Sequence, residues 1–171
     1  MADYFIKTIV HQSIPRRMMS PVEEFVLKHV FEWEDDPDVI GSICFFAGEY
    51  TASYIKIDDK EGLRKLITDS RALSPELCDG IERAWVLDEG SIEIDEIGGY
   101  EPIFQAIVKR NKGELPFVSI EQAFTCTKMH PDAFGGAGIL IGPDSIESMN
   151  TTTWLEKRIA DLNLNGRRGE A

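Results

Sequence analysis

The chain has 171 residues, a length typical of one globular domain with its own hydrophobic core. Hydrophobic residues make up 43% and charged residues 28%, the ordinary proportions of a folded protein, which argues against a disordered chain. The formal net charge of -12 argues against direct binding to nucleic acid or to an anionic membrane, because phosphate groups would be repelled.

The acidic excess is confined to the middle of the sequence. Residues 1–31 hold four basic and three acidic side chains, residues 32–101 hold six basic and nineteen acidic ones, and residues 102–171 hold eight of each. A surface of this sign favours a basic protein partner. It also serves solubility, so the charge alone leaves both interpretations open.

The cysteines and the N-terminus indicate the compartment. The three cysteines lie far apart and form no disulfide framework, which favours the reducing cytoplasm. The chain begins Met-Ala-Asp and has no long apolar run there, so we expect no secretory signal. No stretch approaches the roughly 18 apolar residues of a membrane span. The sequence therefore predicts a cytoplasmic protein without membrane contact.

The first third of the chain predicts a strand, a helix and an acidic loop. Residues 3–11 are rich in strand formers. Ser20, Pro21 and Glu23 then form the pattern of a capping box, with Ser as N-cap and Pro at the first helical position. Residues 32–38 carry five acids and a proline, and we expect a solvated loop there.

The middle third predicts short strands between helices. We expect strands at 39–46 and 51–57, joined by a turn at Gly48 and Glu49, and then a helix at 58–68. A short helical turn from Ser74 to Ile81 is expected to precede a strand pair at 84–87 and 91–97.

The last third predicts a helix, two strands and a final helix. Residues 102–112 form the first helix, and residues 117–128 and 137–141 form the strands. Thr153 and Glu156 have the spacing of a capping box for the last helix. Its apolar side chains are expected to face inward: Trp154, Leu155, Ile159 and Leu162.

This order of elements predicts an α+β fold. Strands come in pairs between helices, which favours a mostly antiparallel sheet with helices packed on one face, a two-layer sandwich. We expect one domain over residues 1–162 and a frayed tail over 163–171.

The segment 124–141 holds the most unusual local chemistry. Cys126, His130 and Asp132 could ligate zinc, or they could form a thiol nucleophile with its base. A structural zinc site usually has four ligands in paired spacings, and Cys44 and Cys78 are solitary. We therefore expect no metal and no cofactor, and these three residues are only weak catalytic candidates.

The same segment contains a run of glycines. Gly136, Gly138 and Gly142 precede a strand, whereas a dinucleotide site needs its glycines to open a helix. We expect Gly135, Gly136 or Gly138 to sit where a Cβ would be strained. A phosphate-binding nest of backbone amides is the alternative.

Short motifs near both ends resemble an uncharacterised bacterial protein family. Its members start MADYF and carry a TCS…FGGG segment before a terminal Trp-Leu helix. The chain matches at its first five residues, at Thr125-Cys126-Thr127, at Phe134-Gly135-Gly136-Ala137 and at Trp154-Leu155. It departs at residues 129–132, where basic residues are expected. The family has no known activity, so the resemblance implies no catalytic residue.

The leading functional interpretation is a non-enzymatic protein-interaction module, such as an accessory or inhibitor protein of a bacterium or mobile element. It would dock a basic protein surface through an acidic face: Glu34, Asp35, Asp36, Asp38, Asp88, Glu89, Glu93, Asp95 and Glu96. One alternative is a small-molecule-binding domain or enzyme that uses Cys126, His130 and Asp132. Another is a nucleic-acid mimic that blocks a DNA- or RNA-binding protein. The sequence leaves the oligomeric state open.

Overall fold

The structure is a computed structural model that describes residues 3–87, 90–128 and 134–166. Seven strands form one antiparallel sheet, namely β1 (Tyr4–Val10), β2 (Ile14–Pro15), β3 (Glu32–Asp35), β4 (Ser42–Ala47), β7 (Val118–Cys126), β8 (Gly135–Ile141) and β9 (Ile146–Asn150). Two more strands, β5 (Tyr54–Lys56) and β6 (Ser91–Glu93), pair in a small second sheet. The expected α+β class is confirmed.

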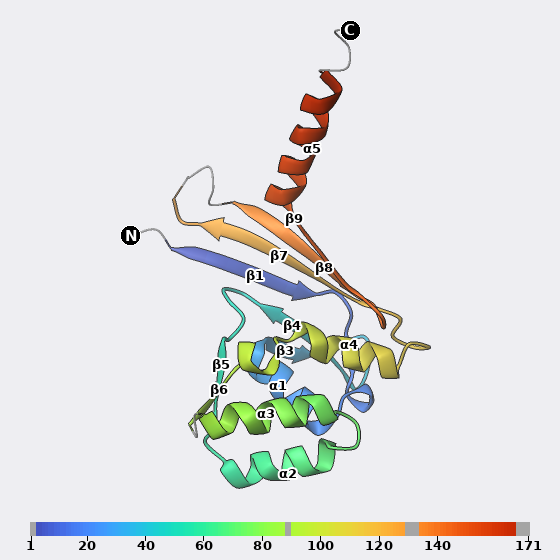
Figure 1. Ribbon diagram of the computed structural model, residues 1–171. Coiled ribbons are helices and arrows are strands. Elements are labelled where there is room, and N and C mark those ends of the chain that lie inside the picture. Colours follow the sequence, from blue (N-terminus) through green and yellow to red (C-terminus); the bar gives the residue numbers. More distant parts are fainter. Residues whose placement is uncertain (1–2, 88–89, 129–133, 167–171) are drawn as a thin grey trace.

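The helices of the described residues are α1 (Pro21–Val30), α2 (Lys60–Ser70), α3 (Pro75–Leu87), α4 (Glu101–Arg110) and α5 (Thr151–Gly166). Two 3-10 turns, η1 (Arg16–Met18) and η2 (Asp95–Ile97), complete this part of the chain. Helices α1 to α4 lie on one side of the long strands, whereas α5 leaves the end of β9 and extends away from them (Figure 1). Within the described ranges, no helix has the length and apolar character needed to span a membrane.

Strand pairing sets the order of the large sheet as β3-β4-β1-β7-β8-β9, and β2 continues beside β4 where β1 ends. Strands β3 and β9 therefore form its two edges. The register places Val10 opposite Ile120, and Ile120 opposite Ile139, so these side chains share one face. All three are buried. The hydrophobic core lies between this end of the sheet and the helices.

The core combines aliphatic side chains of the helices with an aromatic cluster. The Phe31 ring lies 5.0 Å from the ring of Tyr100 and 6.0 Å from those of Phe45 and Phe104. Phe45 and Phe104 are fully buried, and aromatic pairs in tilted or edge-on geometry add to their burial energy. Helix α1 begins as predicted, because Ser20 and Glu23 form a capping box with Pro21 at the first position.

Three local predictions were wrong in the middle of the chain. Residues 32–35, expected in a loop, form edge strand β3 paired with β4, and their side chains are exposed. An edge strand accommodates acidic residues because it has a neighbouring strand on only one side and its exposed side chains face water. Residues 84–87, expected in a strand, continue helix α3 without a break. The strand β5 pairs with β6 and not with β4.

The last helix departs most from expectation. It begins at Thr151, because the Asn150 side-chain oxygen accepts a 2.8 Å hydrogen bond from the Thr153 amide and so acts as the N-cap. The four apolar side chains expected to face inward are exposed instead, Trp154 by 48%, Leu155 by 51%, Ile159 by 55% and Leu162 by 71%. Helical periodicity identified the apolar stripe correctly but gives no information on what covers it.

Candidate functional site

A groove of about 860 Å³ lies between the start of α4, the sheet and the start of α5. Its floor is formed by side chains of β7, β8 and β9 on the face that also carries the core. The residues that line it are Gly98, Glu101, Pro102, Gln122, Ala137, Ile139, Ile146, Ser148, Met149, Asn150, Thr153, Trp154 and Lys157. The groove is thus mainly apolar, with one acid and one base among its lining residues.

The groove exists because α4 covers only one end of the sheet. At the covered end Ile120, Ile139 and Ile141 are buried. Beyond it the same face continues with smaller or polar side chains, namely Gln122 opposite Ala137, and Ala137 opposite Asn150. Ile146, at the outer edge of this face, is 40% exposed. The face therefore keeps a strip of small, polar and apolar side chains that the chain's own helices leave open.

Helix α5 forms one wall of this groove and presents a second apolar surface. Leu155, Ile159 and Leu162 follow the i, i+4, i+7 spacing that places side chains in one stripe on a helix. Trp154 lies at the edge of that stripe and lines the groove. Every α5 side chain from Thr151 to Leu162 is exposed. We call Leu155, Ile159 and Leu162 the α5 stripe.

The position of α5 is set at its base. Strand β9 ends at Asn150 and the helix starts at Thr151, so no linker residue separates them. The Thr151 hydroxyl accepts a 3.1 Å hydrogen bond from the Gly136 amide of β8, and Asn150 caps the helix. These bonds hold the first turn against the sheet and direct the rest of α5 outward.

Tyr100 is buried and contacts the groove residue Gln122. Its hydroxyl accepts a 3.2 Å hydrogen bond from the Gln122 side-chain amide, and its ring is buried against Phe31. Burial raises the pKa of Tyr100 to about 12, and the neighbouring Glu101 carboxylate adds to the rise. Tyr100 therefore stays neutral throughout the physiological range.

The acidic residues of the predicted face that the structure describes lie in or next to two different sheets. Glu34 and Asp35 belong to β3 at the edge of the large sheet, and Asp36 and Asp38 follow it. Glu93 ends β6 of the small sheet, and Asp95 and Glu96 lie in η2. Among the described residues, no hydrogen bond or ion pair joins the two groups, and Asp88 and Glu89 lie outside the described residues. The single acidic face stays a prediction.

Two of these acids have structural tasks. Asp35 forms a 2.5 Å ion pair with Arg16, which also contacts Glu24. Asp36 accepts hydrogen bonds from the amides of Asp38 and Val39, at 2.8 and 3.1 Å, and holds the turn after β3. Hydrogen bonding to the Ser13 side chain and to these amides lowers the pKa of Asp36. Glu34, Asp38, Glu93, Asp95 and Glu96 are exposed.

The predicted thiol site is described only at its cysteine. Cys126 ends β7 and is half-buried, and its sulfur accepts a 3.4 Å hydrogen bond from the Lys128 amide. It lines a cavity of about 320 Å³ together with Phe5, Lys7 and Thr125. His130 and Asp132 lie outside the described residues. Within the described ranges, no three His, Cys, Asp or Glu side chains gather as a metal site would require.

The glycine run is part of a regular strand. Gly135, Gly136 and Gly138 lie in β8, where successive amides point in opposite directions and so form no phosphate nest. Positive φ angles occur at other glycines of the described chain, so none of these three is needed for its φ. Gly136 instead permits close approach, since an added Cβ would lie 2.9 Å from the Gln122 carbonyl oxygen.

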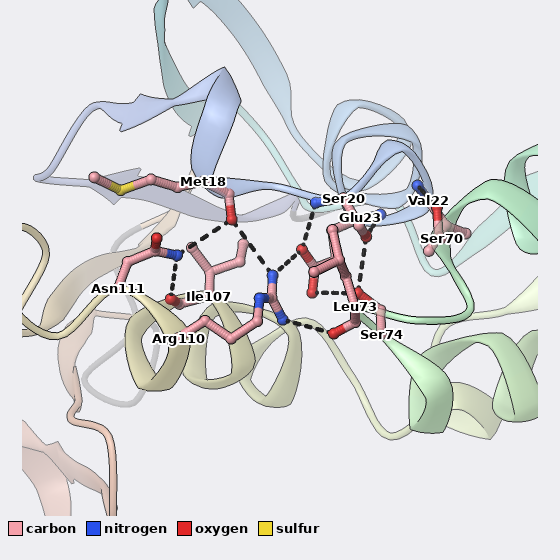
Figure 2. Close-up of polar contacts among 10 residues, drawn as sticks. All are labelled: Met18, Ser20, Val22, Glu23, Ser70, Leu73, Ser74, Ile107, Arg110 and Asn111. Carbon is pink, nitrogen blue, oxygen red and sulfur yellow. Dashed lines mark hydrogen bonds and ion pairs between the residues drawn. The ribbon is translucent and has the colours of Figure 1, made fainter.

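A buried network of polar side chains is the densest polar cluster of the described helices (Figure 2). One Glu23 carboxylate oxygen accepts from the Ser20 amide at 2.8 Å and from Arg110 at 2.6 Å. The other accepts from the Ser74 hydroxyl at 2.8 Å. Arg110 also donates to the carbonyl oxygens of Leu73 and Met18. Because Glu23 is fully buried and both its oxygens are engaged, this network joins α1 to α4 and to the residues before α3.

The sequence did not predict the groove, because its lining comes from five elements, α4, β7, β8, β9 and α5, whose arrangement depends on tertiary packing. Two features of the sequence could have indicated the groove: an amphipathic last helix, and an apolar strand from Ile139 to Ile141 shortly before it. The strand β9 between them was not predicted. The family resemblance stays a hypothesis. No protein-family model matches the chain, and neither the curated proteins nor the solved structures include a significant match.

Proposed function

We propose that this chain is a protein-interaction module that binds through α5 and the adjoining groove. The observation that carries the proposal is the exposed α5 stripe beside an open apolar groove. A protein normally buries such a stripe against another element, and larger exposed apolar patches mark interaction sites. An amphipathic helix laid into a hydrophobic groove is a recurring mode of protein recognition.

The energetics favour an external partner for α5. A helix of 16 residues is only marginally stable in water by itself, and most helical stability in proteins comes from burying an apolar face. The described contacts of α5 with the rest of the chain involve its base, at β8 and β9. A partner that covers the α5 stripe therefore stabilises the helix and removes apolar surface from water at the same time.

The test uses two matched aspartates on α5. Ile159→Asp places a charge in the α5 stripe, and Ala160→Asp places the same charge outside it. Partners captured from lysate by the wild-type chain should be lost with Ile159→Asp and retained with Ala160→Asp. If both variants capture the same proteins as the wild type, α5 is not the binding surface.

The acidic surface supports a second interface, for a basic protein. Glu93, Asp95 and Glu96 are exposed within four residues at the end of the small sheet, and Glu34 and Asp38 are exposed beside the large one. Opposite charges speed association and their effect falls with added salt. A basic groove that normally holds DNA or RNA is one form of such a partner. The cytoplasm is the proposed location, where a free thiol such as Cys126 stays reduced.

Charge reversal tests this second interface. A Glu93→Lys, Asp95→Lys, Glu96→Lys variant should slow the association of a captured basic partner most strongly at low salt and leave the melting temperature nearly unchanged. The matched variant Glu34→Lys, Asp38→Lys tests whether the acids at 34 and 38 contact the same partner as those at 93–96. Association rates that neither variant changes, at any salt concentration, would remove the acidic surface from the proposal.

A further inference from the structure

We propose that the partner seated on α5 and the groove is a second copy of this chain, in a symmetric dimer in which each α5 lies in the other chain's groove. This rests on the proposed function, since it names the occupant of the same surface. One chain carries both an unpartnered amphipathic helix and an open apolar groove next to it. A two-fold axis between two copies pairs each helix with the opposite groove, so that both surfaces are covered at once.

The chain cannot cover both surfaces by itself in the described geometry. Because α5 follows β9 without a linker and is held by Asn150 and Gly136, its stripe has no hinge by which to fold back across the sheet. An intermolecular contact requires no such rearrangement. The helix that fills the groove therefore comes from outside the chain.

The distribution of charge favours a second copy at this place. Two chains of net charge -12 repel each other, and most strongly if residues 32–101, with nineteen acids and six bases, came together. Residues 102–171 hold eight acids and eight bases, and most of the groove and the whole of α5 belong to this neutral part. The Glu101 carboxylate at the groove also suits Arg158, which lies beside the α5 stripe of an entering helix.

The available area suits a dimer. A helix of 16 residues is about 24 Å long and about 10 Å across, so its face and the groove each contribute about 240 Å². Two-fold symmetry repeats both surfaces. The total is then about 1,000 Å², the area that a specific interface should reach.

The experiment measures the mass of the full chain in solution over a series of concentrations. The wild-type chain should move from the 19.2 kDa monomer to twice that mass as concentration rises. Added salt should favour the dimer, because it screens the repulsion between two acidic chains. Ile159→Asp in the helix and Ile146→Asp in the groove should each give a monomer. Leu140→Asp, a matched change on the opposite face of the sheet, should leave the dimer intact.

Mixing the two defective variants gives the sharpest result. A chain with Ile159→Asp keeps its groove and a chain with Ile146→Asp keeps its helix, so a mixed pair regains one of the two contacts. Equimolar mixing should therefore restore dimer that neither variant forms alone. Circular dichroism of each variant establishes that it is folded.

Three results would overturn the inference. The first is a wild-type chain that stays monomeric at every concentration, and the second is a dimer lost with Leu140→Asp but kept with Ile159→Asp. The third is a mixture that restores nothing. If the chain is a monomer and its capture of another protein depends on Ile159, only the second copy as occupant is contradicted. If the chain is a monomer and Ile159→Asp leaves the captured proteins unchanged, the proposed function is contradicted as well.

Discussion

Two regions of this molecule differ in whether their apolar side chains are buried or exposed. In the body, which comprises α1 to α4 with β1, β4 and the covered end of β7 and β8, isoleucines such as Ile107 are fully buried. In the C-terminal arm, which comprises β9 and α5, Ile159 is 55% exposed. The same amphipathic pattern thus produces a core helix in α4 and an uncovered helix in α5. An apolar stripe therefore predicts that side chains are buried, but it does not specify whether the same chain or another one covers them.

The largest effect is expected in the body, at the Glu23 network. Arg110→Ala leaves the buried Glu23 carboxylate without its cation, and breaking a buried pair in this way costs about 3–5 kcal/mol of unfolding free energy. Lys65→Ala removes an exposed i,i+4 pair with Asp69 and should cost less than about 0.5 kcal/mol. Urea unfolding of both variants measures the difference. Equal losses would show that the network does not hold the body together.

Paired isoleucine substitutions compare the two regions directly. Ile107→Ala removes a fully buried side chain and should cost about 2–5 kcal/mol. Ile159→Ala should change the stability of the monomer by less than about 0.5 kcal/mol, because its side chain is already in water. Thermal melts at low protein concentration provide the measurement. A loss at Ile159 as large as that at Ile107 would place α5 within the monomer's own core.

The junction of the two regions is tested at the glycines of β8. Gly136→Ala brings a Cβ to 2.9 Å from the Gln122 carbonyl oxygen and should cost about 1–3 kcal/mol by overpacking. Gly138→Ala meets nothing within 4 Å and provides the matched control. Chemical denaturation of both variants gives the comparison. If Gly136→Ala were as stable as Gly138→Ala, close strand approach would not explain the glycine.

The smallest effect at neutral pH belongs to Tyr100, which contacts the groove residue Gln122. Because its pKa rises from 10.0 to about 12 on folding, its contribution to stability is complete below about pH 10 and is lost as the pH rises toward 12. The absorbance of tyrosinate in the wild-type chain minus that in Tyr100→Phe should show one late ionisation. A difference curve centred near pH 10 would mean that Tyr100 is open to water.

Local chemistry explains which parts of the fold were predictable. The capping box at Ser20 and Glu23 identified the start of α1, because all its contacts lie within four residues. The strand-forming residues at 3–11 likewise identified β1. Strand β3 was missed because Glu32, Glu34 and Asp35 suit a loop equally well, and only pairing with β4 makes them a strand.

The groove could not be predicted in the same way. Its walls come from α4 and α5 and its floor from three strands, so it depends on how far α4 extends across the sheet. The sequence identified Trp154 and Ile159 as one face of a helix but assigned that face to the interior. The predicted acids and the cysteine stretch are partly outside the described residues, and the acidic face and thiol site stay predictions.

Hydrogen exchange at two protein concentrations shows whether a second copy covers α5, because the amides of α5 and of the body are measured in the same experiment. In dilute solution the amides of α5 should exchange quickly and those of α1 and α4 slowly, since only the latter are covered by the monomer. At high concentration the α5 amides and those lining the groove should become protected, while α1 and α4 stay as they were. If α5 exchanges at the same rate at both concentrations, a second copy does not cover it.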